Sequence, residues 1–128
     1  EVRRRIWHHL PAGTSLKNLH HWAQMIKTGE FKKYDFENEE KNLDCYGQRV
    51  PPKYTLSTCK VPVGIFAGVN DKISNVSDLR KLRNTLKAES PDSLVCYHEY
   101  EIGHVSILWN KDIDYFLDII DLIQSIKQ

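Results

Sequence analysis

The chain of 128 residues is long enough for one domain with a modest core. A net charge of +1 provides no field that would attract nucleic acid or an anionic membrane surface, and no apolar stretch approaches the roughly 20 residues of a membrane span. The cysteines form no Cys-x-x-Cys motif, and their spacing fits either one disulfide with a free thiol or three reduced thiols: Cys45, Cys59 and Cys96.

The first periodic segment is predicted to be a helix. Its apolar residues recur at helical spacing: Leu16, Leu19, Ala23 and Ile26. Thr14 or Ser15 can serve as the N-cap, and Gly29 can end the helix. Residues 30–60 are polar and show no sustained period, which predicts a long loop over a surface.

The second half of the chain alternates strand and helix. Residues 61–68 and 93–100 have the apolar, β-branched pattern of strands, and residues 77–90 have leucines at helical spacing. Asn75-Val-Ser77 is a glycosylation sequon, although Asn75 or Ser77 more simply caps this helix.

The last segment, residues 111–128, is predicted to be a helix that docks on the sheet. Its apolar stripe is Ile113, Phe116, Leu117, Ile120, Ile123 and Ile126. Strand, helix, strand, helix is the order of a parallel α/β layer. Two strands make an incomplete sheet, so these residues are expected to be the end of a larger one, with the first 60 residues outside it.

Two residues that can carry chemistry follow the two predicted strands. Asp71 comes after the first strand, and His104 comes after the second. Functional side chains of open α/β sheets gather beyond the carboxyl ends of the strands, so we expect these two to lie on one rim. An aspartate bonded to one ring nitrogen of a histidine leaves the other nitrogen free to act as a base. An aspartate that merely forms a turn is the competing interpretation.

Three stretches closely resemble the acid lipases of the gastric and lysosomal type. They are PAGTSLKNLHHWAQMIKTGEFKKYDF at 11–36, PPKYTLSTCKVPVGIFAGVNDKISNVSDL at 51–79 and HEYEIGHVSILW at 98–109. The resemblance runs from about residue 8 to the end, and the order and spacing of the stretches are specific. It implies the α/β-hydrolase fold and ester hydrolysis without a metal or organic cofactor.

The resemblance also implies a role for individual residues. The family's catalytic acid lies in a stretch similar to GVNDK, which assigns the acid to Asp71, and its base lies in a stretch similar to IGHVSILW, which assigns the base to His104. Residues 1–57 would be part of the cap or lid, and residues 58–128 would be the C-terminal segment of the α/β-hydrolase core. Ser106 departs from the family, which has a carboxylate two residues after the histidine.

The catalytic nucleophile is missing from these residues. Enzymes of the α/β-hydrolase fold hold it in a Gly-x-Ser-x-Gly turn, in the chain order serine, acid, histidine. No serine of the chain has glycines at that spacing: Ser15, Ser57, Ser74, Ser77, Ser90, Ser93, Ser106 and Ser125. The nucleophile is therefore expected upstream of Glu1, and the chain alone is predicted to be inactive.

The functional prediction is the C-terminal part of a secreted or lysosomal serine lipase that hydrolyses neutral lipid esters, either triglyceride or steryl ester. Its expected partner is the N-terminal part of the same protein, and an exposed sheet edge could also pair two copies. The alternative is a non-catalytic half-domain that binds a lipid or a protein. The pairs His8-His9 and His20-His21 have no cysteine or carboxylate at the usual ligand spacing, so no metal is expected.

Overall fold

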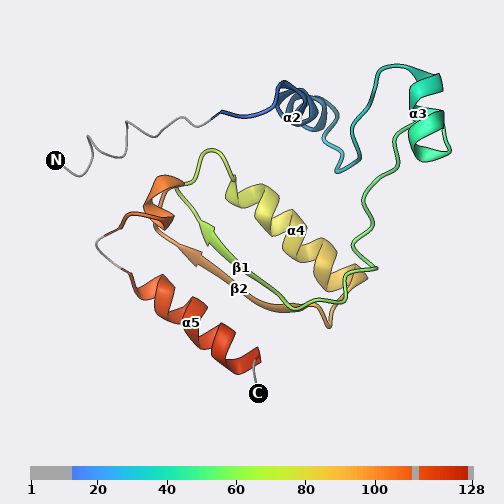
Figure 1. Cartoon of the computed structure of the whole chain (residues 1–128). Coiled ribbons are helices and arrows are strands. Elements are labelled where there is room, and N and C mark those ends of the chain that lie inside the picture. Colours follow the sequence, from blue (N-terminus) through green and yellow to red (C-terminus); the bar gives the residue numbers. More distant parts are fainter. Residues whose placement is uncertain (1–12, 111–112, 127–128) are drawn as a thin grey trace. The chain divides into compact units, whose positions relative to one another are not determined.

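The computed structural model describes residues 13–110 and 113–126. The chain forms two compact units, of which one ends at Tyr54 and the other begins at Thr55 (Figure 1). Each unit is described by itself. The assignment of residues 1–57 to a cap and of residues 58–128 to an α/β-hydrolase core stays a prediction.

The first unit contains the predicted amphipathic helix, α2 (Leu16–Thr28). The side chain of Ser15 accepts a hydrogen bond from the backbone N–H of Asn18 at 3.0 Å, which satisfies one free donor of the first turn. Gly29 ends the helix with φ 66°, a left-handed conformation that glycine adopts without steric cost. The predicted helix and both of its boundary signals are confirmed.

A second helix, α3 (Glu39–Tyr46), lies inside the stretch predicted to be a loop. Asn38 is its N-cap and accepts from the backbone N–H of Lys41 at 2.9 Å, and Gly47 ends it at φ 71°. The loop prediction for residues 30–60 was therefore wrong here. The helix has eight residues and few apolar ones, so it depends on its caps rather than on an apolar period.

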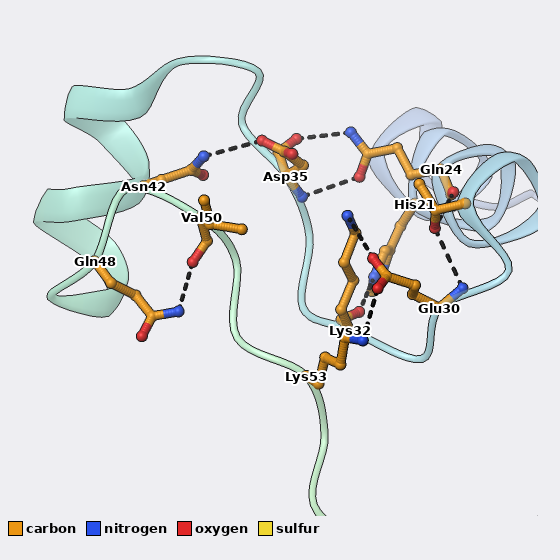
Figure 2. A network of polar contacts seen from close by, with 10 residues as sticks. His21, Gln24, Glu30, Lys32, Asp35, Asn42, Gln48, Val50 and Lys53 are labelled. Atoms are coloured by element: carbon orange, nitrogen blue, oxygen red, sulfur yellow. Dashed lines mark hydrogen bonds and ion pairs between the residues drawn. The ribbon is translucent and has the colours of Figure 1, made fainter.

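A polar network centred on Asp35 connects the segments of the first unit (Figure 2). The side-chain amide of Gln24 donates to the Asp35 carbonyl at 2.7 Å and accepts from the Asp35 N–H at 3.0 Å. It thus pairs both backbone groups of Asp35, as the backbone of a neighbouring β-strand does. Asn42 donates to the Asp35 carboxylate at 2.9 Å and to the Arg49 carbonyl at 3.0 Å, and it accepts from the Phe36 N–H at 3.1 Å. Gln24 is the buried residue of α2 and Asn42 is the buried residue of α3. Both helices are therefore held to the Asp35 segment by hydrogen bonds from side-chain amides.

Replacement of Asn42 by alanine is expected to destabilise the first unit by about 2 to 3 kcal/mol, because it removes three hydrogen bonds of a buried side chain and leaves their part-buried partners unpaired. Asn42 is 3% exposed, so water cannot replace the amide without a local rearrangement. Hydrogen exchange of the Phe36 amide, which Asn42 holds, should accelerate in step with that loss. The exposed Glu40→Ala on the same helix is the control, and equal protection of Phe36 in both variants would contradict the expectation.

The second unit contains a parallel strand pair, β1 (Val63–Gly68) and β2 (Leu94–Tyr100), connected by helix α4 (Val76–Glu89). Figure 1 shows α4 running alongside the two arrows. The predicted strands and the helix between them are confirmed, as is the α/β class. Asn75 is the N-cap and its side chain accepts from the Ser77 N–H at 2.9 Å, so the capping interpretation of this segment holds.

Both ends of this strand–helix–strand unit are tied by hydrogen bonds. Before β1, the Cys59 carbonyl accepts from the buried hydroxyls of Ser90 at 2.9 Å and Ser93 at 2.7 Å, which lie after α4. At the carboxyl ends of the strands, the Val69 N–H donates to the Tyr100 carbonyl at 2.9 Å. Hydrogen bonds thus join the segments that flank β1 to those that flank β2, in addition to the pairing of the two strands.

Helix α5 (Asp114–Ile126) differs from its prediction in the face that it turns to the sheet. The predicted apolar stripe is 39–53% exposed at Ile113, Phe116 and Ile120, and 48–54% exposed at Leu117, Ile123 and Ile126. Contacts with the strands come instead from Tyr115, from Asp118 and from Leu122. The helix is apolar on more than one side, so its period did not determine which side packs on the sheet.

Candidate active site

Asp71 lies in the turn directly after β1 and is 5% exposed. The N–H of Asp71 donates to the Gly68 carbonyl at 3.1 Å, which closes the turn. One carboxylate oxygen, Oδ1, accepts from the backbone N–H groups of Ile73 and Ser74, each at 2.8 Å. Asp71 therefore does form the turn, as the competing interpretation expected. Only one of its two carboxylate oxygens is used for this.

The other oxygen faces His104. Nδ1 of the imidazole lies 2.8 Å from Asp71 Oδ2, and the histidine follows β2 as the residue before a short 3₁₀ turn, η1 (Val105–Ile107). Asp71 and His104 were expected to lie close together because each follows one of two parallel strands, and the structure places them in contact. The Asp71 side chain is 3% exposed and that of His104 is 47% exposed, so the carboxylate is covered while the ring remains open to a reacting group.

The carboxylate is held in its ionised form. Burial raises the pKa of Asp71, but the hydrogen bonds from His104 and from two backbone N–H groups outweigh burial and bring the pKa below its usual value. This pair therefore contributes stability above the unfolded-state pKa of the carboxyl, and the contribution is lost as pH falls through the lower folded-state pKa. An ionised acceptor also means that Nδ1 carries the proton, which leaves Nε2 unprotonated in the neutral ring.

Backbone contacts fix the two loops against each other. The Asn70 N–H donates to the Ile102 carbonyl at 3.2 Å, and the Asn70 side chain donates to Glu101 at 3.2 Å. Gly68 is buried against that same Ile102 carbonyl, and a Cβ at position 68 would overlap the oxygen. Sequence reasoning missed this close approach; the glycine at the end of the apolar run was the available signal.

Tyr115 is a second residue that sequence reasoning missed. It is 4% exposed, and its hydroxyl lies 2.9 Å from the Ile107 carbonyl and 3.2 Å from that of Ser106. These carbonyls belong to the turn that follows His104. The signal was a tyrosine within an apolar helix, since a buried phenol requires a hydrogen-bond partner.

Within residues 13–110 and 113–126, no group of three potential ligands could hold a metal ion. His20 and His21 pack edge-on against Tyr34, and His8-His9 lie outside the described residues. All three cysteines are free thiols. None of the helices that the structure describes is both long and apolar enough to cross a membrane.

No family model matches the chain. A putative lysosomal acid lipase/cholesteryl ester hydrolase from Crotalus adamanteus is 30% identical over 122 residues, which are 93% of this chain and 29% of that protein. The gastric triacylglycerol lipase of Homo sapiens is 30% identical over 123 residues, 94% of this chain and 30% of that lipase. The resemblance to gastric and lysosomal acid lipases is confirmed.

The similarity extends to insects, since Lipase 3 of Drosophila melanogaster is 35% identical over 102 residues, 80% of this chain and 25% of that protein. The chain spans less than a third of the length of each of these three lipases. Together with the parallel strands and flanking helices, the resemblance supports the α/β-hydrolase fold. The catalytic roles of Asp71 and His104 stay predictions.

Proposed function

We propose that this chain is the C-terminal part of a serine lipase that hydrolyses neutral lipid esters, and that it provides the catalytic acid and base. The single observation that carries the proposal is the 2.8 Å contact between His104 Nδ1 and Asp71 Oδ2, formed beyond the ends of two parallel strands. The similarity to lipases over most of the chain supports the reaction class.

The proposed chemistry follows from the tautomer of the ring. With Nδ1–H donating to Asp71, Nε2 of His104 takes the proton of a serine hydroxyl as the serine attacks the ester carbonyl. The imidazolium then returns this proton to the departing alcohol, which leaves the acyl group on the serine. Water then attacks the acyl–serine ester, with Nε2 taking the proton of the water and returning it to the serine oxygen. Asp71 remains ionised throughout; it orients the ring and stabilises its charged form.

The serine is proposed to lie in a part of the protein upstream of these residues, with further strands of the sheet. In the described part of the second unit, β1 pairs only with β2, which leaves its other edge for another strand. A further strand of the same protein or a second copy of the chain could occupy that edge. A lysosomal or secreted location is proposed from the names of the relatives.

The test compares the full-length protein with the 128-residue chain. We expect the full-length protein to hydrolyse a soluble ester and an emulsified triglyceride, and to react with a serine-directed fluorophosphonate. The 128-residue chain alone should show no hydrolysis and no labelling. Turnover by the pure chain would contradict the missing nucleophile. Absence of both turnover and labelling in the folded full-length protein would contradict the lipase proposal and favour a non-catalytic binding role.

A further inference from the structure

The two partners of the Asp71–His104 contact are anchored very differently. Asp71 is buried, and the carboxylate oxygen that does not face His104, Oδ1, accepts from two backbone N–H groups. The His104 ring is nearly half exposed, and the side-chain hydrogen bond described for it is the one to Asp71. The position of the ring therefore depends on the backbone turn that carries it.

That turn is short and has carbonyls that its own hydrogen bonds do not use. In η1, the Val105 carbonyl accepts from the N–H groups of Leu108 at 3.1 Å and Trp109 at 3.2 Å. The carbonyls of Ser106 and Ile107 instead face the hydroxyl of Tyr115. A 3₁₀ turn has weak hydrogen-bond geometry, so an outside donor to its carbonyls contributes materially to its order.

Tyr115 is a rigid donor. It is 4% exposed, and its ring contacts that of Tyr100 at the end of β2, with centroids 5.9 Å apart, and that of Phe116, with centroids 4.8 Å apart. The ring therefore has little freedom to move. Its single hydroxyl proton is donated to one carbonyl at a time, and the nearer is that of Ile107.

We propose that Tyr115 is a positioning residue, whose hydroxyl holds the turn after His104 so that the ring stays within hydrogen-bonding reach of Asp71. Its effect on catalysis rests on the proposed lipase function, whereas its effect on the contact between the two side chains does not. Loss of the hydroxyl loosens the turn and lowers the fraction of molecules in which the contact is formed.

The test is Tyr115→Phe, which keeps the ring and removes the hydroxyl. Tyr100→Phe is the matched control, because the Tyr100 hydroxyl also ties the sheet to α5, through Asp118 Oδ2 at 2.6 Å, but does not touch the turn. In the ¹⁵N-labelled chain, the His104 Nδ1–H proton should exchange with solvent about fivefold to tenfold faster in Tyr115→Phe, and within about twofold of wild type in Tyr100→Phe.

In the full-length protein, Tyr115→Phe should lower kcat for a soluble ester about fivefold to tenfold with little change in KM, since substrate binding is untouched. Unchanged exchange in Tyr115→Phe, or equal acceleration in both variants, would overturn the proposal. If the exchange responds as expected and the wild-type full-length protein has no ester turnover, the positioning role stands and the lipase function fails.

Circular dichroism and thermal unfolding establish that each variant is folded at the temperature of measurement. Should Tyr115→Phe not fold, a singly fluorinated tyrosine at position 115 replaces it, because its hydroxyl is a stronger hydrogen-bond donor. Slower exchange of the His104 Nδ1–H proton is then expected. Exchange as fast as in wild type, or faster, would overturn the proposal.

Discussion

Asp71→Asn in the full-length protein should lower ester turnover by about four orders of magnitude while the fold persists. The amide oxygen of the new side chain can still accept from the N–H groups of Ile73 and Ser74, so the turn is kept. The amide nitrogen then faces His104 Nδ1 and donates to it. The ring must therefore carry its proton on Nε2, and in that tautomer it cannot accept the proton of a serine.

Turnover of a soluble ester and the ¹⁵N spectrum of the His104 ring are the two measurements for this variant. Asp78→Asn is the control, because Asp78 is exposed and pairs with Lys81 on α4. Wild-type turnover in Asp71→Asn would reject the catalytic assignment of the pair. A spectrum that keeps the Nδ1–H tautomer would reject the physical reason given for the loss.

Gly68→Ala is expected to separate the two catalytic candidates and to destabilise the protein by about 1 to 3 kcal/mol. A Cβ at this position overlaps the Ile102 carbonyl, which is backbone and cannot rotate away as a side chain would. The loop that carries His104 must move instead. Since a displacement of about 1 Å can cost about a hundredfold in rate, turnover should fall by roughly that factor.

Gly64→Ala on the same strand is the matched control. Its Cβ would lie 2.5 Å from Leu122 Cδ2, the mobile end of a side chain that can change rotamer, and Gly64 lies at the other end of β1 from Asp71. It should cost less stability and leave turnover unchanged. Equal losses of turnover in the two variants would show that the close approach at Gly68 has no special effect on the site.

The sequence predicted those parts of the fold that local chemistry determines. Helix α2 has a serine before it, a glycine after it and apolar residues at the right period between them. Helix α3 has caps at Asn38 and Gly47 but no apolar face, so a search for periodicity overlooked it. In α5 the apolar residues were found, but which of them meet the sheet depends on tertiary packing around Tyr115 and Leu122.

The contact at the candidate site was predictable because parallel strands bring their carboxyl ends to the same rim. To predict that Asp71 and His104 meet, it was enough to know that the two strands are parallel and which loop carries each residue. The residues that hold them could not be found in this way. Gly68 acts through the absence of a side chain against the Ile102 carbonyl, and the Tyr115 hydroxyl donates to a backbone carbonyl, so neither belongs to a side-chain motif.

The ties at both ends of the strand–helix–strand unit have a consequence for the accuracy of strand pairing. If β2 slipped by one residue against β1, every side chain of the strand would change faces. Such a slip would break the bonds from Ser90 and Ser93 to the Cys59 carbonyl at one end and the Val69–Tyr100 bond at the other. Misaligned pairings are therefore penalised at both ends of the strand pair, and the alignment that joins acid to base is selected as the chain folds.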